Sequence, residues 1–384
     1  MKLEVDDSSL NHNVTSSQRY IVTSSLHFLY LPMLKKRILV APLNWGLGHA
    51  TRCIPIIREL IAQNFDPVIA SDGEALELLK KEFPELEHYT LPSYNIRYPK
   101  NSLYFTWNLL TQTPHILRTI SAEKKVTQHL VQTKNISRII SDNRWGVQSN
   151  IVPSAFITHQ ITVFSGFTTW LSSKIQQKFI RKFDECWIPD LSDHPNLSGK
   201  MGHPKKTGFP VKYLGVISRF EKKVLPIKYD ILVLLSGPEP QRSIFENLMF
   251  NKLKVLDIEI LMVRGVIEEK QVFERKDNFS VYNFLQTEEL EKALNSSRLV
   301  ICRSGYTSLM DLAKLQKMAF LIPTPGQFEQ EYLSGRLKKL KLLVSCSQKS
   351  FGVHKLKEVE NYKGLIGFSS QTDLSGIFAL FKGK

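Results

Sequence analysis

The sequence lacks both long hydrophobic runs and a pattern of closely spaced cysteines. No run of about 18 apolar residues occurs among the 384 residues, so we expect no transmembrane helix. The chain also has no Cys-x-x-Cys pair, which argues against a zinc or redox site. Its four cysteines are Cys53, Cys186, Cys302 and Cys346. A reduced, cytoplasmic protein with buried thiols is the simplest interpretation.

Signatures of nucleic-acid binding are also missing. The chain has no zinc-finger spacing, no RNA-recognition aromatic motif and no tract built only of lysine and arginine. It nevertheless carries 51 Lys and Arg residues against 36 Asp and Glu residues, a formal net charge of +15. This excess favours polyanionic partners. We expect phosphorylated ligands or an anionic membrane surface rather than nucleic acid.

The first 32 residues do not read as part of a folded domain. The apolar segment Tyr20–Pro32 is short and interrupted by polar residues, and the residues before it carry more acid than base, unlike a secretory signal. Met33 is followed directly by Leu-Lys-Lys-Arg, which leads into the first clear strand. We therefore expect residues 1–32 to be an extension that is disordered or not native, with the fold beginning at Met33.

From residue 37 onward, short apolar strands alternate with amphipathic helices. The first strand is predicted at Arg37–Ala41 and the second at Phe65–Ser71, with a helix between them. The pattern loosens over residues 209–228, which contain several Gly and Pro residues, and restarts at Tyr229–Leu235. This rhythm predicts an α/β protein with two doubly wound, Rossmann-like domains. Their predicted bounds are 33–208 and 229–384, joined by a linker over 209–228.

The turn after the first strand is rich in glycine and ends in a histidine. Gly46 and Gly48 allow the backbone to pass close to a ligand. They resemble part of a dinucleotide-binding fingerprint, but Thr51 stands at the third glycine position, and Asp72 ends the second strand where a ribose-binding acid would lie. An NAD-dependent dehydrogenase therefore stays an alternative. His49 stands at the start of the helix, either as a general base or as a capping or packing residue.

The most informative motif lies in the second half, where an apolar strand leads into a Ser-Gly turn and a helix. The turn Arg303-Ser304-Gly305 offers free backbone N–H groups at the positive end of a helix dipole, which suits phosphate. Asp311, farther along the helix, could accept hydrogen bonds from ribose hydroxyls. A second polar cluster, Pro323–Glu331, begins twelve residues later. Together they predict a site for a nucleotide.

These motifs resemble the MurG-like glycosyltransferases of family 28, which have the GT-B fold of two Rossmann-like domains facing a cleft. The resemblance covers most of residues 37–340 and is strongest in the two clusters of the second half. It implies that His49 is the catalytic base and that Arg303-Ser304-Gly305 with Asp311 binds the nucleotide, with aspartate where the family usually has glutamate. Gln330 matches a residue that contacts the donor sugar, whereas Glu331 replaces a glutamine.

The resemblance also places further residues around the substrates. The loop that approaches the donor phosphates contains Gly237 and Arg242, although its prolines remove two N–H donors. Four polar residues follow strands of the first half and are candidates for the acceptor side, with loop stabilisation as the alternative; they are Asp142, Arg144, His159 and Gln160. Gly46 and Gly48 belong to the same side.

The implied activity is an inverting, metal-independent hexosyl transfer from a nucleotide-sugar to a hydroxyl acceptor. The donor expected is UDP-linked, such as UDP-N-acetylglucosamine, and the acceptor could be a lipid-linked precursor of a cell-envelope glycoconjugate. No cofactor or metal is expected, in keeping with the absence of an Asp-x-Asp pair from the chain. A sugar-nucleotide epimerase on the same fold and a noncatalytic sugar-nucleotide-binding protein are the alternatives.

Two aromatic-rich stretches suggest a peripheral contact with an anionic membrane. They are Leu103–Leu110 and Phe167–Phe183, and the second interleaves aromatic residues with lysine and arginine. A basic amphipathic helix of this kind can lie on anionic lipid. A core-facing helix with a solvated basic side is the alternative. The expected location is the cytoplasm, at the inner face of the cytoplasmic membrane.

Overall fold

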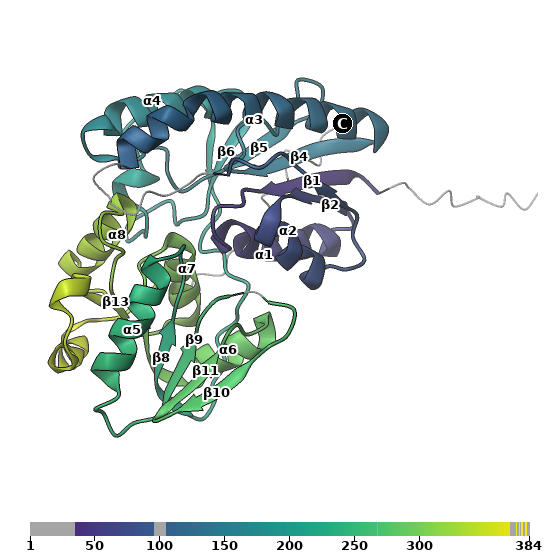
Figure 1. The fold of residues 1–384 in the computed structure, drawn as a ribbon. Coiled ribbons are helices and arrows are strands. Elements are labelled where there is room, and N and C mark those ends of the chain that lie inside the picture. Colours follow the sequence, from purple (N-terminus) through teal and green to yellow (C-terminus); the bar gives the residue numbers. More distant parts are fainter. Residues whose placement is uncertain are drawn as a thin grey trace, which may run out of the picture. The chain divides into compact units, whose positions relative to one another are not determined.

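Two seven-stranded sheets organise the chain in a computed structural model (Figure 1). The structure describes residues 35–95, 105–266 and 268–368, with single positions at 374, 376, 378 and 381, and no side chains for 105–111. The predicted extension, residues 1–32, and the side chains of Leu103–Leu110 lie outside this description. Residues 35–384 belong to one compact unit. Within the described residues, no helix is long and apolar enough to cross a membrane.

The first sheet is parallel throughout and has the strand order β3-β2-β1-β4-β5-β6-β7. Its strands are β1 (Arg37–Pro42), β2 (Asp66–Ser71), β3 (His88–Thr90), β4 (Ile136–Asp142), β5 (Ser154–Ile157), β6 (Glu185–Ile188) and β7 (Val211–Tyr213). The central strands are buried almost completely, as expected for strands covered by helices on both faces.

Helices connect these strands and cover the sheet. They are α1 (Gly48–Ala62), α2 (Gly73–Glu82), α3 (Phe105–Thr133) and α4 (Thr169–Ile180), with short 3-10 segments η2 (Gly166–Thr168) and η3 (Gly199–Met201). Figure 1 shows α1 and α2 on one face of the sheet and α3 and α4 on the other. In α1, Cys53, Ile57 and Leu60 recur at helical spacing and are buried against the sheet.

The second sheet has the order β10-β11-β9-β8-β12-β13-β14 and is parallel except for the β10–β11 hairpin. Its strands are β8 (Tyr229–Leu234), β9 (Ile260–Val263), β10 (Phe273–Lys276), β11 (Phe279–Tyr282), β12 (Ser297–Cys302), β13 (Ala319–Leu321) and β14 (Val344–Ser345). The helices are α5 (Gln241–Leu253), α6 (Thr287–Asn295), α7 (Tyr306–Leu315) and α8 (Phe328–Lys339), followed by η4 (Gln348–Ser350) and η5 (Val353–Asn361).

The predicted fold class, two doubly wound α/β halves, is confirmed by these sheets. The domain bounds stay a prediction. Within the predicted linker, β7 pairs with β6 and extends the first sheet, which the Gly and Pro residues around it conceal in the sequence. The hairpin strand β10 was not predicted because all four of its residues are exposed and show no apolar run.

Both sheets place the turns that follow their strands at the carboxyl edge, where open α/β sheets bind ligands. His49 follows β1, Asp142 ends β4 and His159 follows β5. In the second sheet, Arg303 follows β12 and Gln330 lies in the first turn of α8, after β13. Parallel strand direction therefore brings the predicted residues of each half to one edge.

Candidate active site

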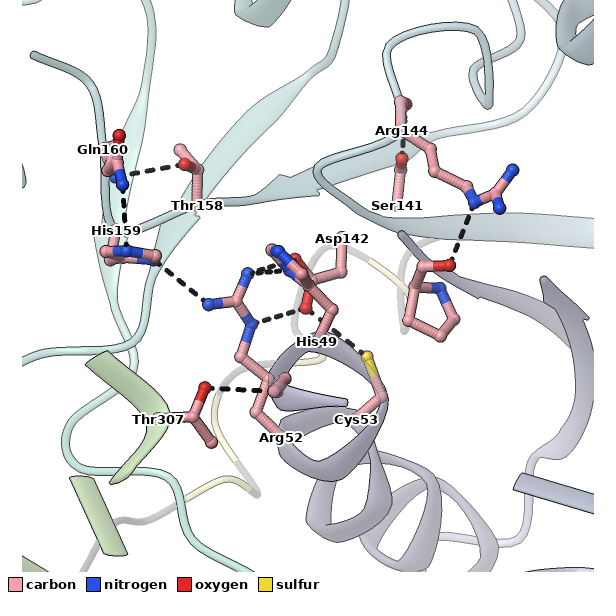
Figure 2. A network of polar contacts seen from close by, with 12 residues as sticks. His49, Arg52, Cys53, Ser141, Asp142, Arg144, Thr158, His159, Gln160 and Thr307 are labelled. Atoms are coloured by element: carbon pink, nitrogen blue, oxygen red, sulfur yellow. Dashed lines mark hydrogen bonds and ion pairs between the residues drawn. The ribbon is translucent and has the colours of Figure 1, made fainter. Parts of the chain in front are cut away.

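His49 is anchored by an aspartate from a neighbouring strand. Its Nδ1 lies 2.9 Å from Oδ1 of Asp142, whose carboxylate is fully buried at the end of β4 (Figure 2). The Nε2 atom of His49 has no hydrogen-bond partner among the described residues. An imidazole held at Nδ1 with an unoccupied Nε2 has the arrangement of a general base. Asp142, predicted on the acceptor side, thus lies against the predicted base.

Burial and neighbouring charges have opposing effects on the pKa values of His49 and Asp142. Burial lowers the pKa of His49, Asp142 raises it, and the nearby Arg52 lowers it further, with a net pKa below the usual 6.5. Burial would raise the pKa of Asp142, but Arg52 and His49 outweigh burial and lower it to about 2. At neutral pH the aspartate is therefore ionised and the histidine is neutral, which leaves His49 able to accept a proton.

Arg52 is a site residue that the sequence reasoning missed. It lies on α1, three residues after His49, and its guanidinium binds both oxygens of Asp142. The same group reaches Nδ1 of His49 at 2.7 Å and Nδ1 of His159 at 3.1 Å. Its spacing from His49 was the available signal, because residues three apart share a helix face.

His159 and Gln160 connect the first half of the chain to the second. Nε2 of His159 lies 3.0 Å from Oε1 of Glu329, and the Gln160 side-chain amide donates to Oε2 of the same carboxylate. The imidazole of His159 also stacks on the ring of Tyr306, with ring centroids 4.1 Å apart and an interplanar angle of 3°. Glu329 and Tyr306 were not predicted, although both lie next to predicted residues.

The helix α7 meets α1 at the two predicted glycine-containing turns. The hydroxyl of Thr307 donates to the carbonyl oxygen of Gly48 at 3.2 Å. A Cβ atom on Gly48 would lie 2.8 Å from that hydroxyl oxygen, so a side chain at this position would collide with α7. Gly46, with φ +73°, adopts the left-handed backbone that glycine favours, and a Cβ there would meet open space.

Arg303 is buried beneath the predicted nucleotide turn rather than exposed on it. Its Nη atoms donate to the carbonyl oxygens of Ile322, Pro323 and Gln241, each at 3.1 Å, and its guanidinium lies 4.0 Å from the ring centroid of Phe245. Nε is buried without a partner among the described residues. Burial lowers the pKa of Arg303 to about 10, so it remains a cation at neutral pH and places positive charge behind the turn.

The rest of the predicted donor turn is tied to α8. Ser304 is buried and donates to the carbonyl oxygen of Gln330 at 2.8 Å. Gly305 is the N-cap residue of α7 and has no side chain that could cover the first N–H groups of the helix. The Gln330 side chain accepts from the Thr324 N–H, and Glu331 accepts from the Gly326 N–H, both at 2.8 Å. Both residues therefore brace the loop before α8.

Asp311 contacts the segment that follows β7. Its Oδ1 accepts a hydrogen bond from the hydroxyl of Ser218 at 2.6 Å, and Arg219 lies near it. Burial raises the pKa of Asp311 to about 6, with Ser218 and Arg219 opposing the rise. The predicted ribose acid thus already has one protein partner.

Among the described residues, the remaining predicted residues form no hydrogen bond or ion pair with His49. Gly237 has φ +95°, and Arg242 forms an ion pair with Glu239. Arg144 is completely buried in a separate cluster and binds Asp72 and Glu123. Asp72, which marked the dehydrogenase alternative, is thereby engaged by a protein cation. The structure brings His49, Asp142, His159 and Gln160 together and leaves Arg144 apart from them.

Comparison with known protein families decides the class of this site. Residues 246–360 match the glycosyltransferase family 28 C-terminal domain. The chain is a glycosyltransferase. The family model covers β9 to η5, including the Arg303–Gly305 turn, Asp311 and Gln330. The predicted resemblance to family 28 and the predicted enzyme class are confirmed.

Relatives of this glycosyltransferase extend the likeness over most of the chain. An uncharacterised glycosyltransferase of Methanopyrus kandleri is 23% identical over 323 residues, 78% of this chain and 89% of the relative. The UDP-N-acetylglucosamine–N-acetylmuramyl-(pentapeptide) pyrophosphoryl-undecaprenol N-acetylglucosamine transferase of Clostridium tetani is 23% identical over 299 residues, 76% and 78% of the two chains. The solved glycosyltransferase SnogD from Streptomyces nogalater superposes with a TM-score of 0.57 at 14% identity, covering 87% of this chain and 93% of that structure. The glycosyltransferase therefore has the GT-B fold.

Proposed function

We propose that this glycosyltransferase moves a hexosyl group from a UDP-linked donor, such as UDP-N-acetylglucosamine, to a hydroxyl acceptor, with inversion at the anomeric carbon. The observation that carries the proposal is the buried Asp142 carboxylate bound to Nδ1 of His49, which leaves Nε2 available as a proton acceptor. The name of the Clostridium tetani relative supports the donor, because it gives UDP-N-acetylglucosamine as the substrate of that enzyme.

In the proposed step, Nε2 of His49 takes the proton of the acceptor hydroxyl as its oxygen attacks the anomeric carbon. The new bond forms from the oxygen to this carbon while the bond from the carbon to the diphosphate oxygen breaks. The leaving group is the nucleoside diphosphate, which departs with both bonding electrons. A single displacement of this kind inverts the configuration. The neutral state of His49 at neutral pH supports its role as the base.

The leaving diphosphate needs positive charge, which we propose the protein supplies without a metal. The N-terminus of α7 begins directly after Gly305 and presents unsatisfied backbone N–H groups. The buried Arg303 cation beneath the same turn adds to this potential. We assign the donor to this turn, with Asp311 and Gln330 beside it, and keep Gly237, Arg242 and Glu331 as proposed donor contacts.

The acceptor side is proposed to lie on the first half of the chain, near His49, Gly46, Gly48, His159 and Gln160. We further propose that α4 rests on an anionic membrane that holds a lipid-linked acceptor. The exposed apolar residues Phe167, Trp170 and Ile175 recur on one face of η2 and α4. Exposed basic residues adjoin them, namely Lys174, Lys178, Arg181 and Lys182. Apolar and basic groups on one surface suit an anionic lipid interface.

A ligand panel tests the proposed donor. Calorimetric titration and thermal unfolding would be recorded with UDP, UDP-N-acetylglucosamine, UDP-glucose, GDP-mannose, TDP-glucose and NAD. The UDP compounds are expected to bind and to raise Tm, because a ligand that binds only the folded state stabilises it by mass action. Stabilisation by NAD without a response to UDP compounds would contradict the proposal.

A further inference from the structure

Arg52 is a buried cation at the centre of the His49 site. Its side chain is 1% exposed, and its guanidinium binds both carboxylate oxygens of Asp142. The same guanidinium lies 2.7 Å from Nδ1 of His49 and 3.1 Å from Nδ1 of His159. Figure 2 shows the arginine between the two histidines. One planar group thus contacts three of the predicted site residues.

The chemistry of arginine determines where the proton of His159 lies. A guanidinium only donates hydrogen bonds, so Nδ1 of His159 must accept from Nη1 of Arg52. The proton of the neutral imidazole is then on Nε2, which faces the Glu329 carboxylate at 3.0 Å. Burial opposes ionisation of Glu329, but His159, His49 and Arg52 outweigh burial and lower its pKa. The arrangement is therefore Arg52 donating to His159, and His159 donating to Glu329.

Asp142 is ionised, so Nδ1 of His49 donates to its Oδ1, and the 2.7 Å approach of Nη2 of Arg52 to the same nitrogen is a contact between two donors, not a hydrogen bond. Arg52 therefore acts on His49 through Asp142 and through its own charge. It neutralises the buried carboxylate, which would otherwise draw a proton onto the adjacent imidazole. It also repels a second positive charge beside it. The groups that face His49 or its partner are Arg52 and Cys53 on α1, Asp142 on β4, His159 after β5, Tyr306 on α7 and Glu329 on α8. The thiol of Cys53 and the phenol of Tyr306 have pKa values raised well above their ordinary ones by burial, so neither ionises near neutral pH.

We propose that Arg52 is the positioning residue of this site, holding Asp142 beneath His49 so that the imidazole stays an unprotonated acceptor, and joining that pair to His159 and Glu329. The proposal rests on the proposed function of His49 as the base. It assigns Arg52 no contact with substrate. Its position one helical turn after His49 lets α1 carry both the acceptor and the group that controls it.

Two substitutions are expected to move the titration of His49 in opposite directions. Arg52→Met removes the cation and leaves a buried carboxylate whose remaining partner is His49, so the midpoint of His49 should rise by about one pH unit or more. Asp142→Asn removes the anion and keeps the cation, so the midpoint should fall. Arg52→Lys retains the positive charge, so its His49 midpoint should stay close to that of the unmodified protein.

The titration midpoint of His49 is read from the ¹⁵N resonances of the histidine side chains in the full chain. The His49 signals are assigned by comparison with the His49→Gln protein, and the measurement requires no turnover. The acid limb of kcat against pH should shift with this midpoint in the Arg52→Met protein, while the donor Kd stays within about twofold. An unchanged midpoint in Arg52→Met would overturn the proposal, even if kcat fell. If Arg52→Met does not fold, Arg52→Gln, which also removes the charge, replaces it in the same measurement. Full turnover by the His49→Gln protein would instead contradict the proposed function of His49 as the base, and this result is distinguishable from the midpoints.

Discussion

At the scale of single residues, burial decides which charged groups can meet a ligand directly. Arg144 and Arg303 are both almost completely buried, and carbonyl oxygens or carboxylates of the protein bind the Nη atoms of both and Nε of Arg144. Asp142 is buried in the same way and faces His49 and Arg52. Residue type and position in the sequence identify such groups but do not reveal whether solvent reaches them.

The buried carboxyl of Asp311 leads to a prediction for stability against pH. Its pKa is raised from 3.8 to about 6, mainly by burial, so the folded protein binds a proton that the unfolded chain has lost between these values. Stability must therefore fall as pH rises through this window. Asp311→Asn keeps an acceptor for Ser218 and cannot ionise. The free energy of unfolding of this variant, relative to the unmodified protein, should rise between pH 4 and pH 7.

Urea unfolding of the two proteins at pH 4, 5, 6 and 7 measures this difference. Glu123, whose pKa burial raises to about 7, is present in both proteins and cancels in the comparison. A stability difference that is the same at every pH would show that Asp311 does not titrate in the window stated.

At the scale of helices and strands, α4 stands out because it exposes several large apolar side chains. Phe167 is fully exposed in η2, and Trp170, Leu171 and Ile175 follow it on the exposed face of α4. The buried residues of this helix, Ser173, Gln176 and Ile180, are mostly polar. The helix therefore turns its larger apolar side chains outward, the reverse of a helix that only covers a sheet.

Sedimentation with vesicles of phosphatidylglycerol and phosphatidylcholine tests whether this face binds lipid. The unmodified protein should bind at low salt and dissociate as salt screens the charges. Lys174→Glu/Lys178→Glu should abolish binding, whereas Lys252→Glu/Lys254→Glu, an equal charge change on exposed residues at the end of α5, should retain it. Equal binding of the two double variants would count against α4 as the contact.

Elements with long apolar runs were predictable, and short or exposed ones were not. The strand predicted at Tyr229–Leu235 is β8, and the predicted Glu185–Pro189 is β6, each within one residue. By contrast, β7 has three half-buried residues and β14 only two residues, too few for any periodic signal. The edge strand β10 is wholly exposed and has no apolar pattern.

The same distinction applies to the candidate site. Residues that follow strands, such as His49, His159 and Ser304, could be placed from the alternation of elements. The contacts of Arg52 with Asp142 and of His159 with Glu329 span 90 and 170 positions, and no local pattern encodes them. Glu329 adjoins the predicted Gln330, yet only the packing of the two halves reveals its partner.

At the scale of the whole molecule, a few polar contacts join the two halves at the carboxyl edges of their sheets. Tyr306 donates to the carbonyl oxygen of Pro189 at 2.7 Å and stacks on His159, while Thr307 meets Gly48. The first residues of α7 therefore contact the half that carries the proposed base. This is the arrangement that transfer between a donor on one half and an acceptor on the other requires.

Turnover by the His49→Ala protein tests the central claim most directly. With UDP-N-acetylglucosamine as donor and a lipid-linked saccharide as acceptor, kcat should fall by about 10²- to 10⁴-fold, the usual contribution of a general base. The donor Kd should be unchanged, since the donor is assigned to the α7 turn, and His129→Ala, on the exposed side of α3, should turn over normally. A His49→Ala protein with the turnover of the unmodified enzyme would contradict His49 as the proton acceptor.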